Sequence, residues 1–255
     1  MRARLALGLT LRGGVIAAAV LFGAGMLYRH LEQEALEARL VRTDPDRVLR
    51  DAGLVRSALQ IARPAYAAHC ARCHGADLQG DRARGVPDLA DSVWLYGFGQ
   101  VTDIETTILY GVRSGHPKAR NITDMPAFGR IGQLSAPEIR DVVEFVYGLS
   151  HHGVDTAAAK RGQALFNDKG SCYDCHGADA TGNIDYGAPD LTGATWLYGG
   201  DRATLYDSVF NGRHGLCPAW IRSLSPAEVR ALSVYLYLAS HTRASVTAHR
   251  GGSAR

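Results

Sequence analysis

Two segments of the chain repeat apolar residues at intervals of three and four, which places them on one face of an α-helix. The segments are residues 136–149 and 226–240. Their apolar positions are Ile139, Val142, Val143 and Val146 in the first and Val229, Leu232 and Leu236 in the second. Each follows a serine with a glutamate three residues later, the capping-box pattern of a helix start. These pairs are Ser135 with Glu138 and Ser225 with Glu228. Both segments are therefore predicted to be amphipathic helices.

Four shorter segments also predict helices, and no segment alternates cleanly as a strand would. They are residues 64–72, 103–110, 157–168 and 202–210. The expected fold class is therefore all-α.

Near the N-terminus, residues 13–28 form an uncharged, mostly apolar run that follows three arginines. As a helix this run would be about 24 Å long, slightly short of a hydrocarbon core of about 30 Å. Residues 5–11 extend it enough if Arg12 snorkels to the surface. The run predicts an uncleaved single-pass anchor with its N-terminus inside. A cleavable signal peptide is the alternative, and both readings export residues 31–255.

The chain contains an internal repeat, since residues 66–99 resemble residues 167–201 with an offset of 102 positions. The offset then falls to 92, because Met125-Pro-Ala-Phe corresponds to Cys217-Pro-Ala-Trp. Each repeat is near 90 residues, a plausible size for a small domain. The predicted organisation is an anchor, a helical spacer, two domains and a disordered tail rich in Gly, Ser and Arg. These cover residues 1–30, 31–63, 64–150, 151–241 and 242–255, respectively.

The two repeats are mildly acidic, although the chain as a whole carries a formal net charge of +3. Residues 64–150 hold eight basic and ten acidic residues, and residues 151–241 hold seven and nine. So small a net charge does not suggest nucleic-acid binding, and none is expected, while acidic repeats suit a basic protein partner.

Four of the five cysteines lie in two copies of the pattern Cys-x-x-Cys-His. The copies comprise Cys70, Cys73 and His74, and Cys172, Cys175 and His176. Two thiols one helical turn apart can bond to the two vinyl groups of one heme, and the next residue offers an imidazole to the iron. A four-thiolate zinc site would need neither the two histidines nor a gap of about 100 residues. The repeats therefore predict two covalently bound heme c groups in two tandem class I cytochrome c domains behind a transmembrane helix.

Other repeated positions fit the same site. Pro87 and Pro189 could offer their carbonyls to the second nitrogen of the ligating histidines, or could simply punctuate loops. Trp94 and Trp196 could bind heme propionates or serve as core aromatic residues.

The sixth iron ligand differs between the repeats. Met125 is the natural axial thioether of one heme. The equivalent position of the second repeat is Cys217, and His214 precedes it by three residues. The other heme could therefore bind His214, bind Cys217 or be five-coordinate. His214 is preferred here, because imidazole is the commoner ligand in electron carriers and thiolate would lower the potential strongly.

These motifs resemble the diheme cytochrome c subunit, subunit III, of cbb3-type heme-copper oxidases. The resemblance rests on Cys-x-x-Cys-His-Gly, Gly-x-Pro-Asp-Leu, Trp-Leu-Tyr-Gly and Met-Pro-Ala-Phe-Gly, and covers about residues 40–240. It implies a subunit of the bacterial inner membrane with its heme domains in the periplasm. Such a subunit relays electrons from soluble cytochrome c to the monoheme and catalytic subunits and has no oxygen-reducing site of its own.

The resemblance also implies that the repeats exchange axial ligands. Met125 would then bind the heme held by His176, and His214 or Cys217 the heme held by His74. The chain departs from the family in carrying Cys217 where many members have methionine, and in its first 40 residues.

Two other functions are compatible with the sequence. One is a free-standing diheme shuttle that serves other electron acceptors. The other is a sulfur-oxidising enzyme that uses a Cys217-ligated heme.

Overall fold

The structure, a computed structural model, describes the backbone of residues 2–120, 123–150 and 153–251, and side chains between residues 20 and 242 of these ranges. Within them the fold is helical, with isolated β-bridges and no strand. The all-α prediction is confirmed. The elements are α1 (Arg2–Arg42), η1 (Pro45–Arg50), α2 (Ala52–His69), α3 (Ala71–His74), η2 (Arg82–Arg84), α4 (Val101–Tyr110), α5 (Ala136–Ser150), α6 (Thr156–Asn167), α7 (Tyr173–His176), α8 (Arg202–Asn211) and α9 (Pro226–Gly251).

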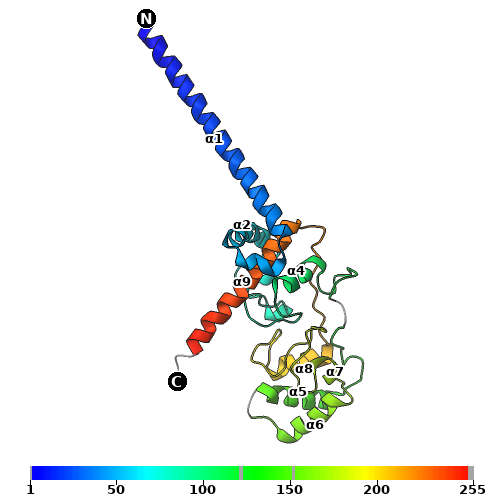
Figure 1. The fold of residues 1–255 in the computed structure, drawn as a ribbon. Coiled ribbons are helices and arrows are strands. Elements are labelled where there is room, and N and C mark those ends of the chain that lie inside the picture. The colour runs from blue at the N-terminus through cyan, green and yellow to red at the C-terminus, as the bar shows by residue number, and fades with distance from the viewer. Residues whose placement is uncertain (1, 121–122, 151–152, 252–255) are drawn as a thin grey trace.

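Two globules make up the body of the molecule, and each has its own hydrophobic core (Figure 1). The first globule contains α2, α3, α4 and α9 and includes the first cysteine motif. The second globule contains α5, α6, α7 and α8 and includes the second motif. Each globule therefore takes its closing helix, α9 or α5, from the other sequence repeat. The predicted domain boundary between residues 150 and 151 would separate α5 from α6, although these two helices pack together most extensively.

The predicted spacer, residues 31–63, is instead part of the first globule. Leu40, Val48 and Leu54 from this segment are at most 1% exposed and lie in its core. The helix predicted to begin at residue 64 begins at Ala52. It starts there because Asp51 Oδ1 accepts hydrogen bonds from the N–H groups of Gly53 and Leu54, at 2.8 and 3.1 Å.

The predicted disordered tail, residues 242–255, is also corrected in part. Helix α9 continues to Gly251 without interruption, while residues 252–255 lie outside the described part. Between Thr242 and Arg250 there is neither Gly nor Pro, so nothing in the sequence breaks the backbone hydrogen bonds of the preceding helix.

Helix α1 leaves the first globule as a single long rod (Figure 1). Its described side chains between Val20 and Leu31 are exposed, including Leu21 at 74% and Phe22 at 72%. Among the described residues, no helix has the length and apolar character that crossing a membrane requires. The predicted anchor spans residues 1–30, and the side chains of its first 19 residues lie outside the described part, so this anchor stays a prediction.

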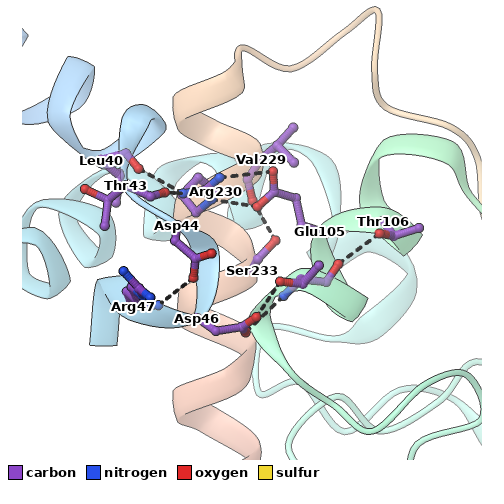
Figure 2. Close-up of polar contacts among 11 residues, drawn as sticks. Leu40, Thr43, Asp44, Asp46, Arg47, Glu105, Thr106, Val229, Arg230 and Ser233 are labelled. Carbon is purple, nitrogen blue, oxygen red and sulfur yellow. Dashed lines mark hydrogen bonds and ion pairs between the residues drawn. The ribbon is translucent and has the colours of Figure 1, made fainter. Parts of the chain in front are cut away.

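A buried arginine joins the end of α1 to the first globule (Figure 2). Arg230 of α9 is 7% exposed. It donates to the carbonyl oxygens of Leu40, at 3.0 Å, and Thr43, and its Nε lies 2.6 Å from Glu105 Oε2 of α4. The guanidinium thus satisfies the free carbonyls at the end of α1 and pairs with a carboxylate of a third helix.

We expect Arg230→Met to destabilise the first globule by about 3 kcal/mol, because it strands a largely buried carboxylate and two carbonyls. Urea unfolding of the full chain, followed by circular dichroism, measures the change. Arg222→Met is the matched control, since Arg222 is an exposed arginine just before α9. Equal midpoints for the two variants would contradict a stabilising role for Arg230.

Candidate functional site

Each cysteine motif is folded into one helical turn that begins at its first cysteine. In the first globule the N–H groups of Cys73 and His74 donate to the Cys70 carbonyl at 3.1 and 3.0 Å. In the second, Cys175 and His176 donate to the Cys172 carbonyl at 3.2 and 2.9 Å. All five cysteines, each in the described part, are free thiols. Each turn therefore carries two free thiols and an imidazole on five consecutive residues.

The two histidines are held in the same way. The Nδ1 atom of His74 lies 3.1 Å from the carbonyl oxygen of Pro87, and that of His176 lies 3.0 Å from the carbonyl oxygen of Pro189. If Nδ1–H donates to the carbonyl, Nε2 keeps the lone pair that a metal ion needs. Burial lowers the pKa of both imidazoles, which keeps them neutral, although the carbonyl contact opposes this shift.

The two tryptophans pack against the cores. Half-buried Trp94 packs against the core of the first globule and Trp196 against that of the second. This packing accounts for both residues as core aromatics, and a propionate contact stays a prediction.

Two residues proposed as sixth ligands, Met125 and Cys217, each pair with a backbone segment of the other sequence repeat. Cys217 and Val112, which follows α4, exchange backbone hydrogen bonds of 3.0 and 2.9 Å. Met125 and Arg213, which follows α8, exchange bonds of 3.3 and 3.2 Å in the same pattern. The two bridges show that Met125 and Cys217 occupy equivalent positions, as the repeat predicts. Met125 packs against the core of the second globule.

Cys217 lies near the thiols of the first cysteine motif. Burial raises the pKa of its half-buried thiol, and the nearby Cys73 thiol raises it further. Burial likewise raises the pKa of Cys70 to about 11, and the nearby Cys217 thiol adds to this effect. Cys217 is therefore close to the two thiols that precede His74.

His214 points elsewhere. Its side chain is 62% exposed, and its Nδ1 lies 2.7 Å from Asp124 Oδ2. The same carboxylate lies 3.2 Å from Arg113, which also donates to the carbonyls of Gly215 and Thr123. His214 is therefore engaged by Asp124, and the choice between His214 and Cys217 as sixth ligand stays a prediction. No sequence motif predicts this polar group of Arg113, Asp124 and His214, because Asp124 and His214 lie 90 residues apart in the chain.

Comparison with known proteins agrees with this geometry. The family model described as "Cytochrome c" matches residues 61–150. The family model described as "Cytochrome C oxidase, cbb3-type, subunit III" matches residues 157–236. Each match contains one Cys-x-x-Cys-His turn. Cytochrome c domains imply covalently bound heme c, and the free thiols and neutral imidazoles fit that group.

Curated relatives extend the match over most of the chain. The cbb3-type cytochrome c oxidase subunit CcoP of Cereibacter sphaeroides is 37% identical over 202 residues, 79% of this chain and 68% of the relative. The CcoP subunit of Azospirillum brasilense is 37% identical over 211 residues, 80% of this chain and 70% of the relative. The FixP subunit of Bradyrhizobium sp. (strain ORS 278) is 42% identical over 192 residues, 74% of this chain and 63% of the relative. The chain therefore belongs to the family of cbb3-type cytochrome c oxidase subunits III, the CcoP and FixP proteins.

Proposed function

We propose that this protein is the electron-transferring cytochrome c subunit of a cbb3-type oxidase and that it carries two heme c groups, one in each globule. The observation that carries the proposal is the duplicated turn in which two free thiols precede a histidine held by a proline carbonyl. Bound heme supplies a reversible one-electron couple. The protein residues attach the group, orient the histidine and shield the site.

In the first globule, Cys70 and Cys73 would form the thioether bonds and His74 would bind the iron. Cys172, Cys175 and His176 would do the same in the second. Pro87 and Pro189 would hold the imidazoles in the orientation and tautomer that leave Nε2 toward the iron. Trp94 and Trp196 remain candidates for propionate contacts.

Met125 would serve as the further ligand of the heme held by His176, and Cys217 as that of the heme held by His74. The proposal is supported by the packing of Met125 against the second core. It is also supported by the nearness of Cys217 to Cys73, whose thiol raises the pKa of Cys217. A neutral thioether and a sulfur that can become anionic would give the two hemes different potentials.

Helix α1 would anchor the protein to the bacterial inner membrane in a single pass and leave both globules in the periplasm. The uncharged run of residues 13–28 supports this proposal, as do the exposed side chains of Leu21 and Phe22. Partners would be the monoheme and catalytic subunits of the oxidase and a soluble basic cytochrome c. The acidic balance of both sequence repeats suits the latter.

Affinity purification from detergent-solubilised membranes tests the proposed function. The purified material is assayed for b-type heme and for oxygen uptake with reduced cytochrome c. Co-purification of both supports the proposal. A chain that emerges alone with c-type heme only would indicate a shuttle, and thiosulfate-dependent reduction would then indicate a sulfur-oxidising enzyme.

We expect Cys217→Met to raise the midpoint potential of one heme by on the order of 100 mV, since thioether replaces a potentially anionic sulfur. Redox titration and electron paramagnetic resonance of the purified protein measure the change. His214→Ala is the matched control and should leave both potentials and both signals unchanged. If His214→Ala shifts a heme signal and Cys217→Met does not, the sixth-ligand assignment to Cys217 is wrong.

The rate at which a basic soluble cytochrome c reduces the protein should fall several-fold as salt rises from about 20 to about 200 mM. Stopped-flow absorbance measures this rate. A small uncharged reductant is the control, and its rate should not follow ionic strength. A salt-independent rate with the basic cytochrome would contradict the proposed electrostatic docking.

A further inference from the structure

A tyrosine of each globule reaches the loop that holds the histidine of the other globule. Tyr198, in the second globule, lies against Gly85, two residues before Pro87. A Cβ added to Gly85 would stand 2.2 Å from the Tyr198 ring. The loop can therefore accept this ring only because residue 85 has no side chain. Gly85 also has a φ of +66°, which favours glycine independently.

The reverse contact has the same form. Tyr96, in the first globule, lies against Gly187, two residues before Pro189. A Cβ added to Gly187 would stand 2.2 Å from the Tyr96 ring, and Gly187 has a φ of +69°. Two independent contacts of the same type relate the globules, so an accidental approach of one side chain does not explain them.

Each tyrosine is also held by arginine in its own globule. The Arg213 guanidinium carbon lies 4.1 Å from the centre of the Tyr198 ring, a cation–π distance. Arg213 is fixed in turn by Asp207 and Ser208, both at 2.9 Å. Its backbone pairs with Met125, the proposed sixth ligand of the second globule.

The arrangement around Tyr96 is parallel. Arg120 lies 5.3 Å from its ring centre, and Arg113 lies 3.4 Å from its hydroxyl oxygen. Arg113 follows Val112, whose backbone pairs with Cys217. Each tyrosine thus contacts an arginine in or next to the backbone bridge to a proposed sixth ligand of its own globule. It also contacts the histidine-holding loop of the other globule.

We propose that Tyr96 and Tyr198 are positioning residues that fix the two heme sites relative to each other and so set the rate of electron exchange between them. This inference rests on the proposed function. In the exchange, one electron would pass from one heme to the other, and the tyrosines would neither gain nor lose an electron or a proton. Their role is to prevent the histidine loops from moving apart.

The test compares the double variant Tyr96→Ala/Tyr198→Ala with Tyr96→Phe/Tyr198→Phe in the full, heme-loaded chain. Heme content per chain and circular dichroism establish that each variant is folded and loaded. Interheme electron transfer is followed after rapid photoreduction, and pulsed electron paramagnetic resonance of the oxidised protein reports the distribution of interheme distances. Phe98→Ala is the matched control, because Phe98 lies two residues after Tyr96 and is 78% exposed.

We expect the alanine pair to slow interheme transfer at least about tenfold, since small misplacements of reacting groups have large effects on rate. The interheme distance distribution should broaden at the same time. The phenylalanine pair and Phe98→Ala should stay within about twofold of the wild type, because both rings of the contact remain. Tyr96→Leu and Tyr198→Leu, which keep an apolar side chain, should each slow transfer less and serve if the double variant does not fold.

Unchanged rates and distances in the alanine pair, or a phenylalanine pair as slow as the alanine pair, would overturn the inference. If the leucine variants replace the alanine pair, rates and distances equal to the wild type overturn it too. Fewer than two hemes in the wild-type chain would overturn the proposed function as well. Heme content therefore distinguishes failure of the proposed function from failure of the tyrosine role.

Discussion

The packing of α2 against α9 and of α6 against α5 is the interaction on which the rest of the structure depends. Each pair buries an apolar helix face, and each joins the helix that leads into one cysteine motif to a helix from the other sequence repeat. The chain must cross between the globules to form both pairs, and the segments around Met125 and Cys217 lie at these crossings. Neither site can therefore be completed by one sequence repeat alone, and the two globules are expected to fold as a coupled unit.

The exchange of helices between the two sequence repeats also connects the sites to the rest of the molecule. Helix α9 closes the first globule and also carries Arg230, which holds the end of α1. The rod that would enter the membrane is thus fixed to the helix that packs beside the first motif. At the opposite side, the reciprocal contacts of Tyr96 and Tyr198 join the first globule to the second. A continuous series of packed helices and loops thus connects α1 with both sites.

Local features could be predicted from the sequence, because short-range patterns determine them. The capping boxes, the helical periods and the Cys-x-x-Cys-His turns depend on residues a few positions apart. An apolar stripe shows that a helix packs, yet not against which helix, so the role of residues 31–63 in the first core could not be derived. The position of His214 could not be derived for a related reason: ligand chemistry ranks side chains, while the distant Asp124 decides where this one points. The helical end of α9 was missed because the Gly- and Ser-rich last residues dominated the composition.

The two sites differ in one main respect, which follows from their shared geometry. Their histidines lie 3.1 and 3.0 Å from equivalent carbonyls, so this contact would make the two imidazoles nearly equal as iron ligands. The tyrosine contacts are reciprocal and act on both sites alike. The remaining difference is the proposed sulfur ligand, a neutral thioether at Met125 and an ionisable thiol at Cys217. An anionic sulfur stabilises the oxidised iron. A single substitution in a duplicated fold would thus provide the driving force for electrons to rest in the second globule, without any change in the frame that holds the hemes.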